Sequence, residues 1–132
     1  MASKRLLIDT VVIKNYVGEI DNIATYQETV IERCYCPCGF GAGIDNHGKN
    51  STDNGRLYIF DVKSIAKSRE GNIRTYLPYR EWLASASKDN HWTINDNGRD
   101  YFVKDNIEYH IVGFSHKKSG TKRMWHFEVD GR

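Results

Sequence analysis

The sequence lacks any apolar run that approaches the ~20 residues of a membrane-spanning helix. Its first nine residues, MASKRLLID, carry two basic residues and reach an acid after a short apolar stretch, so we expect no secretory signal peptide. Neither sign of charge is in large excess, because 19 Lys and Arg stand against 17 Asp and Glu, for a net charge of +2. These absences argue against membrane, collagenous and secreted classes. They also weaken any role in which coating a nucleic acid is the main task.

Cysteine is scarce, and all three cysteines lie within Cys34–Cys38. An odd, clustered set cannot form a disulfide framework. On an extended strand Cys34, Cys36 and Cys38 share one face, and His47 could supply the fourth ligand of a tetrahedral zinc site. Paired cysteines in structural zinc sites are usually separated by two or more residues. We therefore favour semi-buried thiols at a strand end in a reducing compartment, and expect no metal site.

Known catalytic signatures are absent: the sequence contains no HExxH, GxSxG, Walker or Rossmann motif. The glycine-rich Gly39–Gly43 follows a strand, but no Lys-Ser/Thr comes after it and it does not open a helix, which argues against a phosphate loop. The five histidines are scattered along the chain, at His47, His91, His110, His116 and His126. We expect a protein that is not an enzyme, with no catalytic residue and no cofactor. A Cys–His nucleophile pair stays open as an alternative, because such pairs meet only in space.

What the sequence does contain is period-two alternation of Val, Ile, Tyr, Phe and Trp, interrupted about every ten residues by Gly, Asn and Asp. This pattern is typical of an all-β domain, and 132 residues suit one domain, residues 1–132. The expected strands are Leu6–Lys14, Ile23–Cys36, Leu57–Val62, Thr75–Pro78, His91–Ile94, Arg99–Lys104, Ile107–Phe114 and Arg123–Val129. We predict a mainly β fold, a small antiparallel β-barrel or sandwich of about seven strands.

Details of this prediction follow from single residues. Imperfect alternation in Ile23–Cys36 predicts a β-bulge in that strand, and Pro37 ends it. One short helix is expected at Tyr79–Ser87, directly after Pro78. The polar, basic stretch Lys63–Asn72 is expected to be a helical turn or a loop. The last three strands are expected to form an antiparallel meander.

Two polar segments are the candidate functional regions. Gly39–Arg56 is a long, flexible loop rich in Gly and Asn, and loops of this length in a compact domain are usually functional or disordered. His116–Arg123 is a basic hairpin tip with aromatic residues nearby, which indicates weak, salt-sensitive contact with phosphates. Charge is also divided along the chain, from −2 over residues 1–62 to +4 over residues 63–132. Such a division suits a protomer whose acidic edge meets the basic edge of a neighbour.

The order of strands and loops carries a resemblance to a known family. The motifs are DTVVIKNY (Asp9–Tyr16), YQETVIERCY (Tyr26–Tyr35), LYIF (Leu57–Phe60), LPYREW (Leu77–Trp82), HWTI (His91–Ile94), and Gly98–Asp100 followed by YFVK (Tyr101–Lys104). Together with a closing strand, they span nearly the whole chain. In this respect the chain resembles the small minor capsid or head–tail joining proteins of tailed bacteriophages and of prophages of Gram-positive bacteria. It is most similar to the head-completion, or stopper, type.

This resemblance implies a structural role and a set of partners. Stopper-type proteins are small β-barrels with a long loop that assemble as a ring below the portal and adaptor, close the head, retain packaged DNA and receive the tail. The expected partners are the chain itself in a six- or twelve-fold ring, portal or adaptor proteins, tail-terminator or tail proteins, and double-stranded DNA in the channel, with no membrane. The expected location is the virion neck, after assembly in the host cytoplasm.

The resemblance also assigns residues. The loop would gate the channel or dock on the next ring through Gly41, Asp45, Asn46, His47, Lys49, Asn50, Asp53 and Asn54. The basic hairpin would contact DNA or a partner ring through Lys117, Lys118, Lys122 and Arg123.

Two other functions remain open from the sequence alone. The first alternative is a single-stranded nucleic-acid-binding barrel of the OB type, with Tyr58, Phe60, Tyr101 and Trp125 as stacking platforms. The second is an enzyme or zinc protein that uses Cys34, Cys36, Cys38 and His47.

Overall fold

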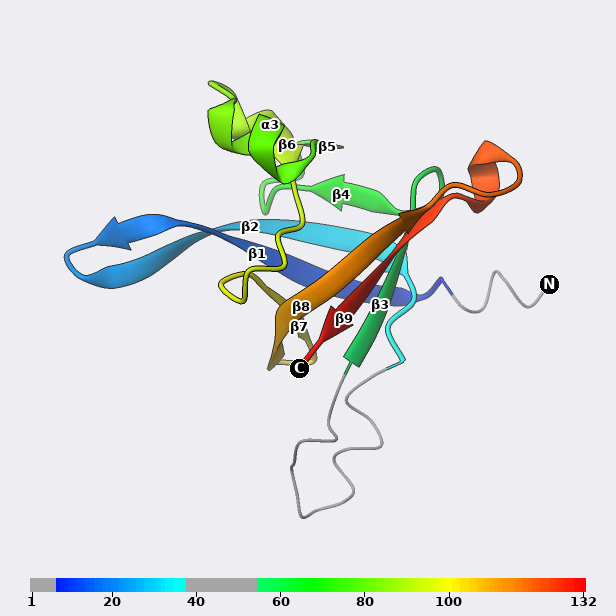
Figure 1. The fold of residues 1–132 in the computed structure, drawn as a ribbon, viewed down its shortest axis with the longest axis horizontal. Coiled ribbons are helices and arrows are strands. Elements are labelled where there is room, and N and C mark those ends of the chain that lie inside the picture. The colour runs from blue at the N-terminus through cyan, green and yellow to red at the C-terminus, as the bar shows by residue number, and fades with distance from the viewer. Residues whose placement is uncertain (1–6, 38–54) are drawn as a thin grey trace, which may run out of the picture.

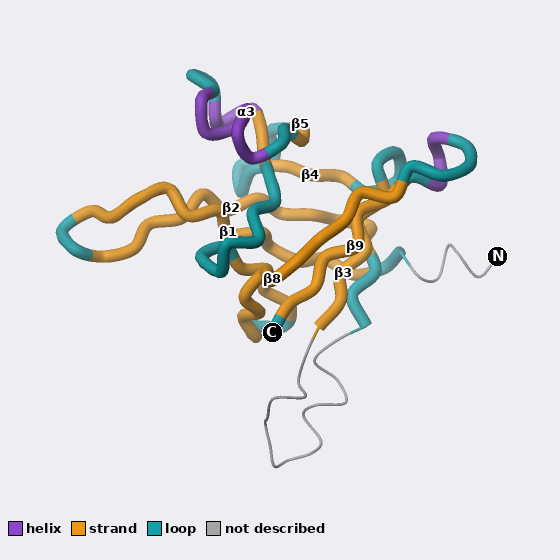
Figure 2. The backbone as a smooth tube through the Cα atoms, in the orientation of Figure 1, coloured by secondary structure: helices purple, strands orange, loops and turns teal. Residues whose placement is uncertain are grey.

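The computed structural model describes residues 7–37 and 55–132 and is mainly β, as the sequence predicts (Figures 1 and 2). The strands are β1 (Asp9–Ile20), β2 (Ile23–Cys34), β3 (Gly55–Phe60), β4 (Ile65–Lys67), β5 (Thr75–Tyr76), β6 (His91–Trp92), β7 (Tyr101–Lys104), β8 (Ile107–Lys117) and β9 (His126–Gly131). Within the described residues there is one α-helix, α3 (Tyr79–Ala84), and two short 3₁₀ helices, η1 (Lys88–Asn90) and η2 (Lys122–Met124).

Seven strands form one antiparallel sheet in the order β3-β9-β8-β7-β1-β2-β4, and β5 and β6 form a separate parallel pair. The predicted meander of the last three strands is confirmed, because β8 pairs with both β7 and β9. The sheet is not closed into a barrel. It curls instead, so that Tyr35, just after β2, forms two backbone hydrogen bonds with Tyr58 of edge strand β3, at 3.0 and 2.8 Å. A closed barrel would need a continuous row of backbone hydrogen bonds at this position, and the structure has this single bridge instead.

The first strand extends further than predicted. We expected Asn15 and Gly18 to end it, but β1 continues to Ile20. Gly18 lies at a register shift opposite Thr25 and has φ 138°, so it forms a bulge that bends the strand. The turn comes later, at Asp21 and Asn22, with φ of 55° and 68°. These left-handed values at both central residues match the tight hairpin turn that Asp and Asn favour.

The bulge predicted in the second strand is confirmed at Arg33. Asp9 pairs with Cys34 and Thr10 with Glu32, which leaves Arg33 as the extra residue, with φ 60°. A bulge shifts the alternation of the residues that follow it. Cys34 and Cys36 consequently both face the interior and are buried.

Several further boundaries differ from the sequence-based expectation. β3 covers Gly55–Phe60 instead of Leu57–Val62, so the last two residues of the predicted loop lie in a strand. The last strand begins at His126 because Lys122–Met124 forms a 3₁₀ helix. β8 continues to Lys117 because β9 pairs with it as far as Lys117↔His126. The helix ends at Ala84, where Ser85 turns to extended backbone and Lys88 Nζ donates to the carbonyl oxygens of Leu83 (2.9 Å) and Ser85 (3.2 Å). The polar stretch Lys63–Asn72 contains the short edge strand β4.

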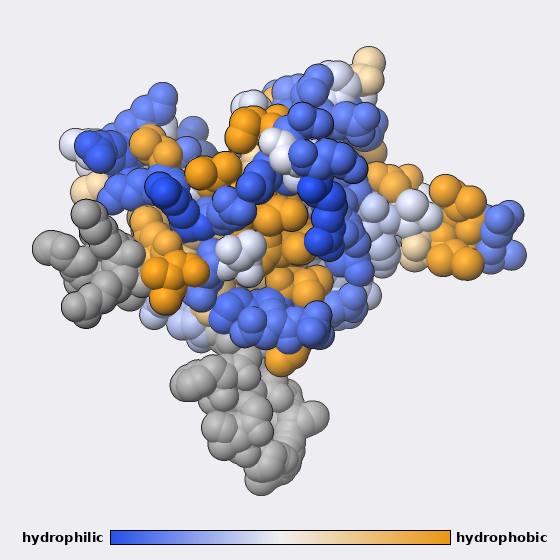
Figure 3. Space-filling model, turned by 180° about the vertical axis from the view of Figure 1, so that it is seen from behind, coloured by the Kyte–Doolittle hydropathy of each residue, from blue (hydrophilic) through white to orange (hydrophobic). Residues whose placement is uncertain are grey.

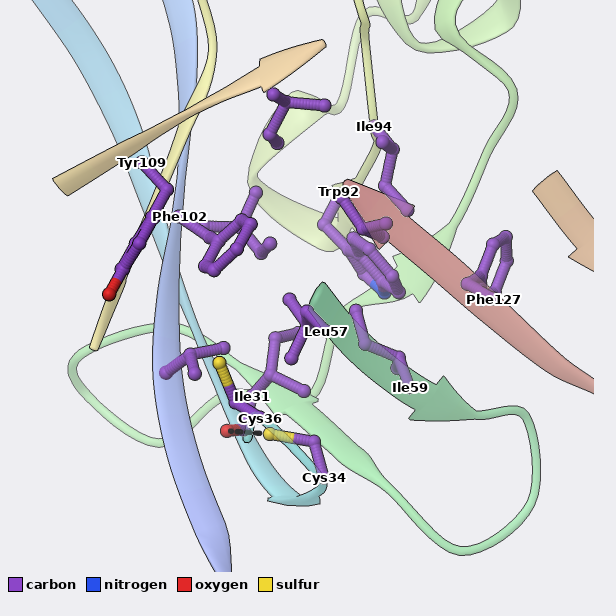
Figure 4. Close-up of a cluster of buried hydrophobic side chains, with 14 residues drawn as sticks. Ile31, Cys34, Cys36, Leu57, Ile59, Trp92, Ile94, Phe102, Tyr109 and Phe127 are labelled. Atoms are coloured by element: carbon purple, nitrogen blue, oxygen red, sulfur yellow. Dashed lines mark hydrogen bonds between the residues drawn. The ribbon is translucent and has the colours of Figure 1, made fainter. Parts of the chain in front are cut away.

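The hydrophobic core fills the inside of the curled sheet (Figure 4). Its members are Val11, Ile13, Ile31, Cys34, Cys36, Leu57, Ile59, Trp92, Ile94, Phe102, Tyr109, Ile111, Phe127 and Val129. Trp92 is the last residue of β6, and Ile94 belongs to the segment that follows β6 and crosses the concave side of the sheet. Because Trp92 and Ile94 pack into the core, the β6–β7 connection covers the concave side of the sheet. On β9, only glycine fits at position 131, since a Cβ there would lie 2.6 Å from the Phe102 ring.

A buried polar cluster joins β1 to this connection. Asn15 Nδ2 donates to Asp100 Oδ2 at 2.8 Å and to the Thr93 carbonyl oxygen at 2.9 Å, while the Tyr16 amide donates to Asp100 Oδ1 at 3.0 Å. The side chains of Asn15, Thr93 and Asp100 are at most 2% exposed. Burial raises the pKa of the Asp100 carboxyl group above its ordinary value, and the two donated hydrogen bonds oppose this rise.

We predict that Asp100→Ala lowers the free energy of unfolding by about 2–3 kcal/mol at neutral pH, because it strands the Tyr16 amide and removes one acceptor from Asn15. Urea denaturation followed by tryptophan fluorescence measures the loss. The matched control Asp96→Ala, at an exposed turn position, should stay within about 0.5 kcal/mol of wild type. Equal effects of the two substitutions would contradict this account.

The difference in stability between wild type and Asp100→Ala should also depend on pH. Because the folded-state pKa of Asp100 is raised, its ionised form is disfavoured in the fold, and stability from this group falls as pH rises through that pKa. The gap between wild type and Asp100→Ala should therefore be widest in acid and narrower at neutral pH.

Candidate functional site

The most prominent surface feature is a two-stranded arm, residues 15–29, which projects from the body of the protein (Figure 1). β7 pairs with β1 only at Val12–Lys14, and β4 pairs with β2 only at Val30–Glu32. From these positions to the Asp21-Asn22 turn, no third strand of the described residues pairs with β1 or β2. Two-stranded hairpins are marginal on their own, so the arm depends on side-chain bracing at its root.

The outer face of the arm root is braced by tyrosines. The Tyr26 ring contacts those of Tyr16 and Tyr101 edge-on, with centroids 5.8 and 5.6 Å apart. Lys14 Nζ lies 5.2 Å from the Tyr26 ring centroid and pairs with Glu108 at 3.0 Å. Edge-on aromatic pairs and cations over rings each add stability beyond their buried area.

The inner face of the arm root is braced by α3. Trp82 is 1% exposed, and its Nε1 donates to Gln27 Oε1 at 3.2 Å. Gln27 Nε2 in turn donates to the Lys88 carbonyl oxygen at 2.9 Å. The root of the arm is therefore held in one direction from both sides.

The tip of the arm is apolar and acidic. Ile20 and Ile23 form its last cross-strand pair and are 63% and 68% exposed, and Val17 is also exposed. Figure 3 shows hydrophobic residues gathered just behind the hydrophilic end of the arm. Glu19 and Asp21 flank them and form no ion pair within the described residues. Exposed apolar residues grouped on a projection are typical of a contact surface.

The second feature is an apolar cleft of about 520 Å³ at the open seam of the sheet, between β3 and β4. Ile59 and Phe127 form its floor, Ile65 and Ile73 one wall, and Tyr76 another. Tyr76 packs on Phe127 with ring centroids 4.7 Å apart. Ile73 is 66% exposed at the rim, so the cleft opens onto an uncovered apolar edge. Its volume is in the ~300–1,000 Å³ range of binding pockets.

The polar side chains of the cleft are already engaged or sit at its rim. His116 Nε2 lies 2.8 Å from Asp61 Oδ2, and its ring stacks on Phe127 at 3.8 Å. Arg74 Nη1 donates to the Glu28 carbonyl oxygen at 2.7 Å, and burial lowers the pKa of its guanidinium. Lys122 lines the outer edge.

A His–Asp pair in a cleft raises the question of catalysis. Ser64 also lines the cleft, but its hydroxyl donates to the Arg33 carbonyl oxygen at 2.7 Å. Among the described residues no nucleophile is hydrogen-bonded to His116. The contact between His116 and Asp61 anchors the segment after β3 to β8.

The structure places the predicted basic hairpin at the end of β8 and β9. Lys117, Lys118, Lys122 and Arg123 are all exposed. Lys118 and Lys122 hold their ammonium groups 5.5 and 5.9 Å from the Trp125 ring centroid. Four cations therefore gather at one end of the molecule, two of them ordered by a tryptophan.

The four proposed stacking aromatics do not form one platform. Tyr58 and Phe60 lie on the outer face of β3, where Tyr58 stacks on Tyr35 at 5.5 Å and Phe60 stacks on His126 at 5.1 Å. Tyr101 lies at the arm root and Trp125 at the basic hairpin. Tyr101 is apart from the β3 pair because β7 and β3 are not neighbours in the sheet, whereas the Trp125 carbonyl oxygen accepts from the Asp61 amide, next to Phe60.

The cysteine cluster is placed only in part. Cys34 and Cys36 lie in the core, and Cys34 Sγ donates to the Asp9 carbonyl oxygen at 3.3 Å. Burial raises the pKa of the Cys34 thiol to about 12. Cys38 and His47 lie outside the described residues, as do the remaining loop positions Gly41, Asp45, Asn46, Lys49, Asn50, Asp53 and Asn54. No metal-binding cluster of His, Cys, Asp or Glu occurs in the part of the chain that the structure describes.

Sequence reasoning missed the arm and the cleft. The Asp21-Asn22 pair is a strong hairpin signal, and alternation continues on both sides of it, so a longer β1 and the arm tip were within reach of the sequence. The cleft had no such signal, because it joins residues from Ile59 to Phe127 that meet only in the fold.

Comparison with known proteins gives one match. Residues 7–132 match a family described as a family of unknown function, DUF6751. No curated protein and no solved structure matches the chain. No helix in the described residues has the length and hydropathy needed to cross a membrane.

We predict that Cys34 and Cys36 are unreactive in the folded protein, since thiolate is the attacking species and both residues are at most 1% exposed. In a Cys38→Ser variant these two residues are the only thiols left in the chain. At pH 8 the variant should show no fast reaction with a thiol-specific disulfide reagent, and two reacting thiols after unfolding in urea. Rapid labelling of the native variant would mean that this strand end opens readily.

Proposed function

We propose that this chain, which belongs to the DUF6751 family, is a structural virion protein from the neck of a tailed bacteriophage. In this role it forms a ring between the portal or adaptor and the tail, completes the head and retains packaged DNA. The observation that supports the proposal best is the braced, projecting arm with its exposed apolar tip. A protein that works alone has no need of such a surface, whereas one that assembles with copies of itself does.

The distribution of charge also supports assembly. The acidic tip residues Glu19 and Asp21 lie in the half of the chain with charge −2, and the basic hairpin lies in the half with charge +4. Opposite charges on different faces of a protomer steer neighbours into register and discourage like faces from meeting.

The proposed partners follow from this role. They are the chain itself, in a six- or twelve-fold ring, the portal or adaptor above, the tail-terminator or tail proteins below, and double-stranded DNA in the channel. Lys117, Lys118, Lys122 and Arg123 would face DNA or a partner ring. Repetition of a weak cationic contact around a ring turns it into an effective one. The chain would be assembled in the host cytoplasm and function at the virion neck, without catalysis.

A single-stranded nucleic-acid-binding role has one feature in its favour, the aromatic row that Tyr58 and Phe60 form with Tyr35 and His126. Two carboxylates on β9 stand against it. Glu128 pairs with His126 at 3.0 Å, and Asp130 pairs with Arg56 at 2.6 Å on the same strands. A stacking groove for nucleic acid combines aromatics with unpaired cations. Arg56 beside the row is held by these carboxylates, which leaves Lys117, opposite His126, as its one unpaired exposed cation among the described residues, so this role is the second candidate.

The proposed role predicts a defect in particle assembly. Phage particles that lack this chain should accumulate as tailless heads that lose their DNA, and purified chain added to packaged heads should restore DNA retention and tail joining. Nuclease protection and electron microscopy of the particles measure both. Tailed, DNA-retaining particles without the chain would overturn the proposal, as would a gene with no portal or tail genes beside it.

The basic hairpin makes a separate prediction. If Lys117, Lys118 and Arg123 each neutralise one phosphate, the logarithm of the affinity for double-stranded DNA should fall with log salt at a slope of up to about −2.7. Changing all three to Glu should remove the binding at low salt. The control Arg80→Glu, an exposed cation on α3, should act only through net charge. Tighter binding to single-stranded DNA than to duplex would favour the second candidate instead.

A further inference from the structure

We propose that the arm tip of one protomer inserts into the apolar cleft of a second copy of this chain. This inference rests on the proposed function, because it supplies the contact by which a ring would form. It commits to one occupant for the cleft, the Ile20–Ile23 end of the arm.

The first argument is apolar complementarity. Ile20 and Ile23 stand side by side across the hairpin and are the most exposed apolar pair of the arm. The cleft offers Ile59, Ile65, Ile73 and the Tyr76 ring around about 520 Å³ of space. Insertion would remove both exposed isoleucines and the exposed Ile73 from water together. Burial of each large aliphatic side chain favours association.

The second argument is complementarity of charge. The tip carries Glu19 and Asp21 and no basic residue between Val17 and Thr25. The lining of the cleft contains two cations, Lys122 and Arg74, the second of which also donates to backbone carbonyl oxygens, and its one carboxylate, Asp61, is hydrogen-bonded to His116. An acidic tip and a cationic rim attract each other, whereas two tips repel, as do two rims. Charge therefore favours tip-to-cleft contact over tip-to-tip contact.

The third argument is geometry. In Figure 1 the arm tip is at the far left, whereas the end of β3 and the β8–β9 end, which border the cleft, are to the right. The tyrosine contacts and the Trp82–Gln27 hydrogen bond hold the arm in its direction. The tip thus cannot fill the cleft of its own protomer without breaking these contacts. It is available to another copy.

The consequence is a head-to-tail interface. Tip and cleft are different surfaces, so each protomer can give one contact and receive one. Such heterologous contacts continue from copy to copy and close into a ring when the rotation allows it. The contact is small, and we expect a weak, concentration-dependent association in solution that the portal would reinforce.

Site-directed cross-linking tests this geometry. In a Cys38→Ser background, Ile23→Cys marks the tip and Ile73→Cys marks the cleft rim, and a short bismaleimide joins them at high protein concentration. The doubly marked protein should give a ladder of covalent oligomers. A mixture of the two singly marked proteins should give dimers at most. A matched control replaces the rim cysteine by Asp96→Cys, at an exposed turn that does not line the cleft, and should yield at least tenfold less product.

A complementation experiment separates this contact from its alternatives. Ile20→Ser with Ile23→Ser removes the tip, and Ile73→Lys blocks the cleft; each variant should be a monomer by sedimentation. A mixture of the two should form heterodimers, since an intact tip and an intact cleft remain. If the cleft variant associates as wild type does, or if the mixture stays monomeric while wild type associates, the contact is not tip-to-cleft.

The outcomes also distinguish this inference from the function on which it rests. Cross-linking no stronger than the control overturns the tip-to-cleft contact, even if heads require the chain. Strong cross-linking with normal particles in the absence of the chain leaves the contact standing and overturns the neck function. If the cleft instead takes only a small molecule, the protein should bind that ligand and give no cross-linked oligomer in its absence, which also overturns the inference.

Discussion

The structure depends on a mismatch of strand lengths. β1 and β2 pair with each other along twelve residues each, but their outer neighbours are much shorter, β7 with four residues and β4 with three. The backbone groups that face the middle of the hairpin are hydrogen-bonded to the partner strand. Along the two outer edges of its projecting part, no further strand of the described residues pairs with it. The excess length must then either collapse onto the body or be braced. Here the tyrosines at Tyr16, Tyr26 and Tyr101 and the tryptophan at Trp82 brace it.

The cleft has the same origin, in a sheet that does not close. The predicted barrel would require β3 to continue pairing along β2. β4 instead occupies the edge of β2 at Val30–Glu32, and the segment that follows β2 pairs with β3 through the single bridge between Tyr35 and Tyr58. The seam between β3 and β4 is roofed in part by Tyr76 and Trp92 and otherwise left open. The departure from a barrel is therefore what creates a binding surface.

The sequence was informative wherever the cause was local. Alternation fixed the β class, the Arg33 bulge followed from a break in that alternation, and Asp105-Asn106 made the predicted hairpin turn with φ of 53° and 68°. Strand ends were less accurate, since Gly18 and Lys117 continue strands only because a partner strand lies opposite them. The cleft and the separation of the aromatic residues follow from strand order, which no local pattern encodes. The Asn15–Asp100 pair is a contact of this long-range kind as well.

The division of charge along the sequence acquires a physical meaning in this fold. A net balance of −2 and +4 in two halves says nothing by itself, because a curled sheet interleaves strands from both halves. The arm tip escapes that mixing. Glu28 at the arm root pairs with Arg69 at 2.6 Å, whereas Glu19 and Asp21 at the tip form no ion pair within the described residues. Arg74 and Lys122 come from the basic half and border the seam. Like charges therefore remain grouped in the folded protein where a segment projects from the body. In the proposed ring, this is the part of the surface that a neighbouring protomer would contact.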